Sequence, residues 1–162
     1  MRKHTHLAFA GAVGVSTIGM VGMMNSGLDL AFFGTGLMIG ALLPDIDHAG
    51  SALGRRIPII PTVISFVFGH RGLTHSLLFL VLLGLTRPWF SPQFYLGLMI
   101  GTISHLVGDM MTHRGIQLFY PFKMAISFPV SFKTGGVVEQ VLLAIFTAWT
   151  AIKGWETLFL YL

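Results

Sequence analysis

The chain has no cysteine and few charged residues. The absence of cysteine among its 162 residues excludes disulfide bonds, thiolate metal ligands and cysteine nucleophiles. Lysine, arginine, aspartate and glutamate together make up 10% of the chain, whereas an ordinary soluble domain has about 25%. Ten basic and six acidic residues cannot cover the surface of a soluble protein of this length. Because 54% of the residues are hydrophobic, disorder is excluded as well. We therefore expect one integral membrane domain over residues 1–162.

Long runs without a formal charge predict an all-α, polytopic membrane helix bundle with about five spanning helices. Four expected spans are the charge-free runs at residues 4–28, 30–44, 72–86 and 88–108, and the fifth is a helix over 137–152 that is charge-free from residue 140. Residues 57–70 contain Pro58 and Pro61, which would break a spanning helix, so we expect a re-entrant or interfacial segment there. The first run is long and ends without a small-x-small cleavage site, so it is interpreted as a retained anchor.

The basic residues predict the orientation of the bundle, since lysine and arginine collect on the cytoplasmic side of membrane proteins. With the N-terminus inside, eight basic residues lie on the inner side: Arg2, Lys3, Arg55, Arg56, Arg71, Arg114, Lys123 and Lys133. Arg87 and Lys153 lie outside. The sequence therefore predicts a protein of the cell (cytoplasmic, or inner) membrane with its N-terminus inside and its C-terminus outside.

Histidine and aspartate gather in four short segments, at residues 4–6, 44–48, 70–76 and 105–112. In the orientation given by lysine and arginine, all four segments lie at the cytoplasmic ends of the expected helices. Histidine was not counted when that orientation was derived, so the gathering of histidines on one side is an independent observation. We expect the four segments to form one polar site.

Two of these segments carry carboxylates at spacings that suit a cation. His105 and Asp109 are four residues apart, which places them on one face of a helix. An ionised aspartate is costly in a membrane helix, which favours a functional role. Asp45 and Asp47 would face the same side of an extended turn, where they repel each other unless a cation or a proton lies between them. The alternative is a solvated helix end with His48 as a polar cap.

The segment at 70–76 combines histidines with a predicted helix start. Thr74 is the expected N-cap, which would place His75 and Ser76 in the first helical turn. A helix N-terminus beside Arg71 favours an anionic group such as phosphate, and His70 could reach the same point from the loop. The alternative is a capped helix start with incidental histidines.

Together, the four segments offer imidazoles and carboxylates without sulfur. This set favours zinc, with manganese or iron as alternatives and with one or two ions bound, and it is too rich in histidine for a magnesium-only site. Arg71, Arg55 and Arg56 would then hold an anionic substrate at the membrane surface, such as a lipid or isoprenoid phosphate. We expect membrane lipids as partners and no nucleic acid, and the sequence leaves the oligomeric state open.

Three motifs in this order, Leu-Pro-Asp-Ile-Asp-His at 43–48, Gly-His-Arg-Gly-Leu-Thr-His-Ser at 69–76 and Ser-His-Leu-Val-Gly-Asp-Met-Met-Thr at 104–112, resemble the membrane-bound metal-dependent hydrolase family of YdjM-like proteins. The resemblance covers most of the chain. It implies a metal-facing set of His6, Asp45, Asp47, His75, His105 and Asp109. It implies a surrounding set of His48, His70, Arg71, Ser76 and Thr112.

These observations predict a cytoplasm-facing metal-dependent hydrolase that cleaves a phosphoester, or another bond of a lipid-linked or anionic substrate, with metal-activated water. In this hypothesis His70 or Asp47 handles the proton and Arg71 steadies the anion. One alternative is a transporter or a metal or proton conduit that uses the same histidines and aspartates. Another is a membrane scaffold whose metal is structural, with a closed shell of four protein ligands.

Overall fold

The computed structural model describes residues 1–21, 24–51, 55, 59–69 and 71–161. Its helices are α1 (Lys3–Val21), α2 (Gly27–Leu42), α3 (Ile59–Phe68), α4 (Leu77–Gly84), α5 (Pro92–Met110) and α6 (Val137–Tyr161). Three short 3-10 turns join them, η1 (Pro44–Asp47), η2 (Leu73–His75) and η3 (Arg87–Trp89). The described part of the chain has no strand beyond two isolated bridges, Thr112–Phe132 and Ile116–Ile126, in the long loop before α6. The expectation of an all-α protein is confirmed.

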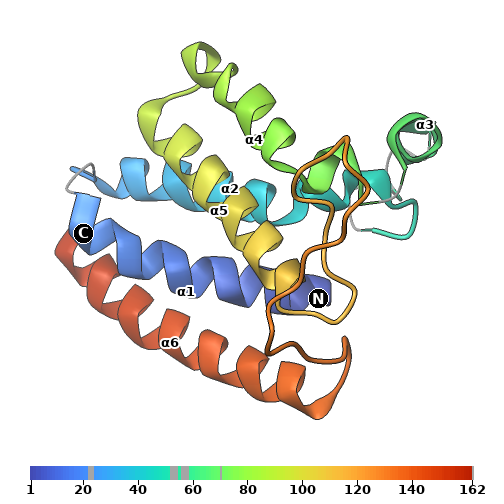
Figure 1. Ribbon diagram of the computed structural model, residues 1–162. Coiled ribbons are helices and arrows are strands. Elements are labelled where there is room, and N and C mark those ends of the chain that lie inside the picture. The colour runs from blue at the N-terminus through green and yellow to red at the C-terminus, as the bar shows by residue number, and fades with distance from the viewer. Residues whose placement is uncertain (22–23, 52–54, 56–58, 70, 162) are drawn as a thin grey trace.

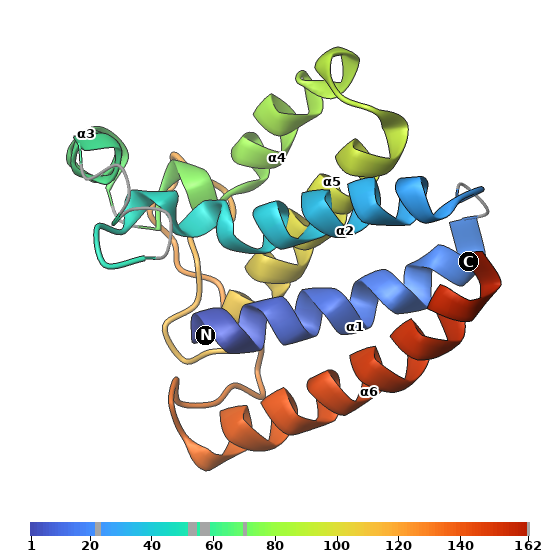
Figure 2. The same cartoon turned by 180° about the vertical axis from the view of Figure 1, so that it is seen from behind.

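Four long helices lie side by side, with α1 between α6 and the pair formed by α2 and α5 (Figures 1 and 2). α1 and α6 run in the same direction, because Gly11 faces Thr150 and Val15 faces Gly154 further along both helices. α2 runs opposite to α1, as expected for consecutive helices in a bundle. The start of α1 and the ends of α2 and α5 therefore meet at one end of the molecule.

α2 and α5 contact each other through glycine. A Cβ added at Gly36 or Gly40 would lie 2.1 or 2.2 Å from a backbone oxygen of α5, and one added at Gly97 or Gly101 would lie 2.1 or 2.3 Å from a backbone oxygen of α2. Small residues spaced four apart allow such close approach of helices in a membrane. The pentapeptide Gly-Leu-Met-Ile-Gly occurs at both places, at 36–40 and at 97–101, so the two helices pack with matching surfaces.

Serine residues set the starts of three helices. The hydroxyl groups of Ser26, Ser76 and Ser91 accept hydrogen bonds from backbone N–H groups in the first turns of α2, α4 and α5. The expected N-cap Thr74 is therefore wrong. Thr74 lies in η2, which is closed by a hydrogen bond from the backbone N–H of Ser76 to the carbonyl of Leu73. Helix α4 starts only after this tight turn.

Two helical segments, Gly27–Asp47 and Val137–Leu160, are long and apolar enough to cross a membrane by length and composition. The expected helix over residues 72–86 is shorter than predicted. α4 contains eight residues and is about 12 Å long, against a hydrocarbon core of about 30 Å. The helix is shorter because residues 73–75 form η2 and Ser76 caps α4, so that the helix begins at Leu77. Within the expected re-entrant or interfacial segment the structure describes α3, whereas residues 57, 58 and 70 lie outside the described residues.

Candidate metal centre

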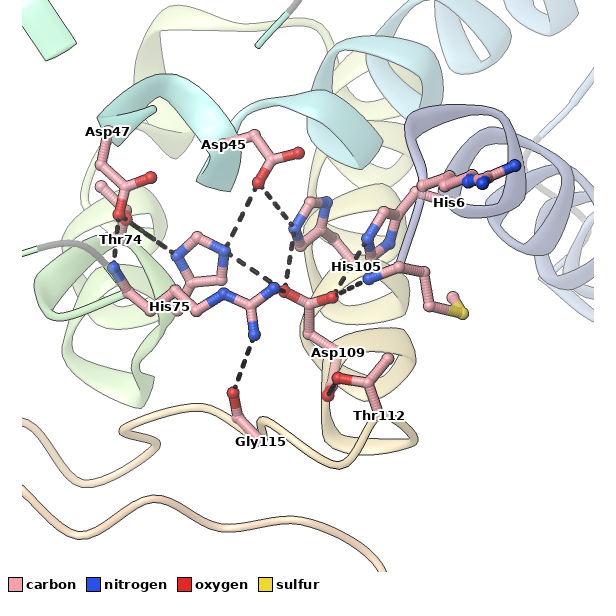
Figure 3. Close-up of polar contacts among 12 residues, drawn as sticks. His6, Asp45, Asp47, Thr74, His75, His105, Asp109, Thr112 and Gly115 are labelled. Carbon is pink, nitrogen blue, oxygen red and sulfur yellow. Dashed lines mark hydrogen bonds and ion pairs between the residues drawn. The ribbon is translucent and has the colours of Figure 1, made fainter. Parts of the chain in front are cut away.

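The four polar segments meet where α1 begins and α2 and α5 end (Figure 3). α1 contributes His6, η1 contributes Asp45 and Asp47, η2 contributes His75, and α5 contributes His105 and Asp109. Two overlapping groups of ligand atoms lie close enough to hold a metal ion. One consists of His6, His105 and Asp109, and the other of Asp45, His75 and His105.

Four of these side chains surround one small space. His75 Nε2 lies 3.8 Å from Asp45 Oδ1 and 3.6 Å from Asp109 Oδ2. His105 Nε2 lies 3.7 and 3.8 Å from the same two oxygens. Ligands at about 2.0–2.2 Å from one tetrahedral ion are separated from each other by roughly 3.3–3.6 Å. The four histidine–carboxylate separations are at the upper end of this range or slightly longer, and they are too long for good hydrogen bonds. Three of the atoms, from Asp45, His75 and His105, form a group that could hold one ion.

The hydrogen bonds of two histidines leave the correct nitrogen available to a metal. His105 Nδ1 lies 2.7 Å from the carbonyl oxygen of Ala41, which can only accept, so Nδ1 carries the proton. Thr74 Oγ1 donates to Asp47 Oδ2 at 3.1 Å and lies 3.0 Å from His75 Nδ1, so this nitrogen donates to the hydroxyl. In both rings Nε2 then carries the lone pair. Both Nε2 atoms are buried, and neither has a hydrogen-bond partner among the described residues, which fits a metal ligand.

The environment of His75 keeps its ring neutral. Burial is the largest influence and lowers the pKa of His75 to about 3. The neighbouring His105 ring lowers this pKa further, and the carboxylates of Asp47 and Asp109 oppose the shift. His75 lies in η2, outside the two helical segments that are long enough to cross a membrane. A neutral imidazole is the form that binds metal.

His6 extends the cluster toward the start of α1. Its ring stacks on His105 at 3.7 Å between centroids, and its Nε2 lies 3.2 Å from Asp109 Oδ1. The amino group of Met1 also contacts Asp109 Oδ1. Gly108 permits this packing, because a Cβ there would meet Met1 and His6. The two oxygens of Asp109 thus face different sets of partners, with Oδ1 toward His6 and Oδ2 toward His75 and His105.

Arg71, predicted as an anion holder, is bonded within the centre. Its guanidinium lies 3.2 Å from Asp109 Oδ2 and donates to the carbonyl of Gly115 at 3.1 Å. Its backbone N–H donates to Asp47 Oδ2 at 2.7 Å. Its φ of 62° is in the left-handed region, which costs energy for a residue with a side chain. These bonds hold the residue in that conformation and place its charge against Asp109.

The other predicted residues lie around this core or outside it. Ser76 caps α4, and Thr112 donates to the carbonyl of Asp109 at 2.8 Å. His48 and Arg55 lie further out, on the wall of a cavity next to Asp45. His70 and Arg56 lie outside the described residues, so their predicted roles stay predictions.

Sequence reasoning missed two residues that position the others. Thr74 fixes the ring of His75, although it was expected only to cap a helix. Glu139, 1% exposed, accepts a hydrogen bond at 2.6 Å from the backbone N–H of Arg2 and another from Gly135. It thereby joins the start of α6 to the start of α1. A buried acid in the first turn of an apolar helix is the signal that could have identified it.

The sequence profile of the YdjM inner membrane protein family matches residues 1–162. The chain belongs to this family. "Uncharacterized protein YvsG" of Bacillus subtilis (strain 168) is 42% identical over 120 residues, which cover 73% of this chain and 75% of that protein. "Inner membrane protein YdjM" of Escherichia coli (strain K12) and its namesake in Shigella flexneri are each 36% identical over 121 residues. These residues cover 70% of this chain, and the chain spans 62% of the length of each of the two proteins. No solved structure matches.

Membership of the YdjM family agrees with the composition and with the two apolar helical segments. The membrane location expected from the scarcity of charge is thereby confirmed. The buried histidines and aspartates of this YdjM-family chain are arranged so that they could hold a metal ion.

Proposed function

We propose that the protein is a membrane-embedded, metal-dependent hydrolase that cleaves a phosphoester, or another bond of an anionic or lipid-linked substrate. The observation that carries the proposal is the arrangement of two lone-pair nitrogens, His75 Nε2 and His105 Nε2, against one oxygen each of Asp45 and Asp109. Burying two imidazole nitrogens without partners beside carboxylates is costly unless a cation lies between them.

The donor set of two imidazoles and two carboxylates favours zinc, with manganese or iron as alternatives. The two overlapping groups, Asp45 with His75 and His105 and His6 with His105 and Asp109, offer donors for one or two ions. A divalent ion held there would act as a Lewis acid and lower the pKa of a water molecule toward 7.

The chain's own residues orient the donors. The carbonyl of Ala41 fixes the ring of His105, and Asp47 fixes that of His75 through Thr74. Arg71 holds one oxygen of Asp109. Such supporting bonds set the tautomer and direction of metal ligands. We keep the proton-accepting role for His70 or Asp47, as the sequence suggested.

Partial exposure of Asp45 favours catalysis over a purely structural metal. Its side chain is 26% exposed, whereas those of His75, His105 and Asp109 are at most 1% exposed. A structural site is closed on all sides, whereas a catalytic site keeps a position open to water and substrate. A catalytic ion would be held by three of these donors, as in the group of Asp45, His75 and His105, and water and substrate would reach it from the exposed side at Asp45.

The core beyond the centre argues against a transporter or a conduit. There, the buried residues between α1 and α2 include Ala10, Ile18, Phe33 and Leu37. A path for ions or protons needs polar groups along its whole length, whereas the buried polar side chains among the described residues gather at the end of the bundle that holds the centre.

We further propose that the metal centre faces the cytoplasm, with the N-terminus inside and five segments crossing the inner membrane. The parallel course of α1 and α6 supports an odd number of crossings between them, here those of α2, α4 and α5. α2, the short α4 with its flanking residues, α5 and α6 then alternate in direction.

Metal analysis of the purified chain tests the proposal. Asp109→Ala and His75→Ala should each lose the bound zinc and the zinc-dependent hydrolysis of p-nitrophenyl phosphate. His113→Ala is the matched control, because His113 is an exposed histidine that bonds to Ser131, and this variant should keep both. If His75→Ala and Asp109→Ala retain full metal content, the site assignment is wrong.

A further inference from the structure

A cavity of about 350 Å³ opens beside the metal centre, between the start of α1 and the segment that follows η1. Its volume is in the range of small-molecule sites, about 300–1,000 Å³. Arg2 and Lys3 form part of its wall from one side, and Asp45, His48 and Arg55 form part of it from the other. The cavity is therefore built from two segments that are distant in the sequence.

This cavity adjoins the open side of the metal centre. Asp45 belongs both to the cavity wall and to the group of possible ligands. Since Asp45 is the partly exposed member of the set and His75 and His105 are fully buried, a solute approaching the donors from this side passes through the cavity. A molecule bound in it would lie next to the ion.

The walls of the cavity carry positive charge. Its lining contains three basic residues, Arg2, Lys3 and Arg55, and one carboxylate, Asp45, whose Oδ1 lies toward His75. The guanidinium of Arg2 lies against Gly135. α1 begins at Lys3 and has no acidic residue in its first turn, so its N-terminus adds to the positive potential. Arg71 contributes little here, because its guanidinium is bonded to Asp109 and Gly115.

One basic side chain of the cavity, that of Arg55, and the backbone of Arg2 are held by hydrogen bonds. The backbone N–H of Arg2 donates to Glu139 at 2.6 Å, and Arg55 Nε donates to the carbonyl of Gly50 at 3.0 Å. The ring of His48 packs closely on Gly50, where an added Cβ would lie 2.9 Å from its Nε2. The cavity thus has an anchored backbone at Arg2 and a bonded guanidinium at Arg55, and Lys3 is an exposed side chain at its rim.

We propose that this cavity is the phosphate-binding subsite of the substrate, in which Lys3 and Arg55 bind the phosphate group beside Asp45. Arginine and lysine at the wall of a concave site are the side chains that recognise phosphate oxygens. This proposal rests on the proposed function and names its substrate class, a phosphate ester. The phosphate can belong to a lipid headgroup or to a free phosphorylated molecule.

The test measures binding to the full chain in detergent micelles by isothermal titration calorimetry. The probes are inorganic phosphate and dihexanoyl phosphatidic acid, each titrated into zinc-loaded and into chelator-treated protein. Lys3→Gln and Arg55→Gln should each weaken binding of both probes about tenfold or more, because each removes a charged partner of the phosphate. The loss should occur with and without zinc, and zinc content should not change.

Arg87→Gln is the matched control, since Arg87 is an exposed arginine before α5, at the end far from Asp109. Its affinity for both probes should equal that of the unmodified chain. Equal affinity for the two probes identifies the phosphate group alone as the ligand, and tighter binding of phosphatidic acid identifies a lipid headgroup. Either result supports the proposal.

The proposal is overturned if the unmodified chain binds neither probe, or if Lys3→Gln and Arg55→Gln bind as tightly as the control. Lys3 is exposed, so its variant is expected to fold even if Arg55→Gln does not. If the chain binds phosphate but hydrolyses no substrate, the proposed function is contradicted and the proposed phosphate subsite is retained. If both variants keep the phosphate affinity, the zinc content and the hydrolysis of the unmodified chain, the proposed phosphate subsite is wrong and the proposed function stands.

Discussion

Thr74 connects two side chains of the centre that have different tasks. Its hydroxyl donates to Asp47 and accepts from His75 Nδ1, so the direction of one ring depends on a carboxylate that it does not contact at hydrogen-bond distance. His75 Nδ1 and Asp47 Oδ2 are 3.6 Å apart. The hydroxyl is therefore the part of this arrangement that determines the tautomer of His75.

Thr74→Val should weaken zinc binding about 10- to 100-fold, because loss of a residue that orients a metal ligand has an effect of this size. Valine keeps the shape of threonine, so the helical content should not change. Competition with a chromophoric zinc chelator measures the affinity. Thr35→Val is the control, because the exposed Thr35 donates to the carbonyl of Ala31 in its own helix. Equal zinc affinity in the two variants would contradict the role of Thr74.

At the scale of residues, the sequence identified the side chains but not their bonds. His6, His75 and His105 were found because histidine is conspicuous in an apolar chain. Which of them pairs with which carboxylate depends on the turn at η1 and on the packing of α5, neither of which follows from local spacing. Arg71 illustrates the limit, since its bond to Asp109 joins residues 38 positions apart in the chain.

Among the helices, the contact of α2 with α5 determines where the donors lie. Asp45 follows the end of α2, and His105 lies near the end of α5. Because the backbones touch at Gly40 and Gly101, the glycines determine how closely these two ends approach. The pentapeptide shared by the two helices is visible in the sequence, but only the structure shows that its two copies contact each other.

Gly40→Ala should separate α2 from α5 and reduce both the thermal stability and the zinc content. Its Cβ would lie 2.2 Å from the carbonyl oxygen of Leu98, and overpacking of this kind costs about 1–3 kcal/mol or more. Gly34→Ala is the control in the same helix, since nothing lies within 4 Å of its Cβ. Alanine favours the helix there, so stability should be equal or slightly higher. Thermal unfolding followed by circular dichroism compares the two, and equal melting temperatures would contradict the packing argument.

For the whole molecule, the alternating directions of the helices place the metal centre at one face. Positive charge and histidine independently indicated the same end of the bundle. The number of complete crossings could not be obtained from the length of charge-free runs. Residues 72–86 form such a run, yet a tight turn and the cap at Ser76 shorten its helix to α4.

The absence of cysteine allows the orientation to be tested with single introduced thiols. Thr134→Cys lies in the exposed loop near the metal centre, and Trp89→Cys lies at an exposed position before α5. With the N-terminus inside, a membrane-impermeant maleimide should label Cys at 89 in intact spheroplasts and Cys at 134 only in inverted vesicles. The reverse pattern would place the centre on the outer side. The unmodified chain gives no background, because it has no thiol.

The partial exposure of Asp45 also has a kinetic consequence. An ion among these donors could leave only after its bonds to the protein are broken, and the buried donors His75, His105 and Asp109 are shielded from competing chelators. Exchange would therefore begin at Asp45 and depend on how often η1 moves away from the histidines. Retention of metal through purification would then reflect slow release as much as tight binding, and a change in η1 could alter the residence time of the ion without altering the ligands that hold it.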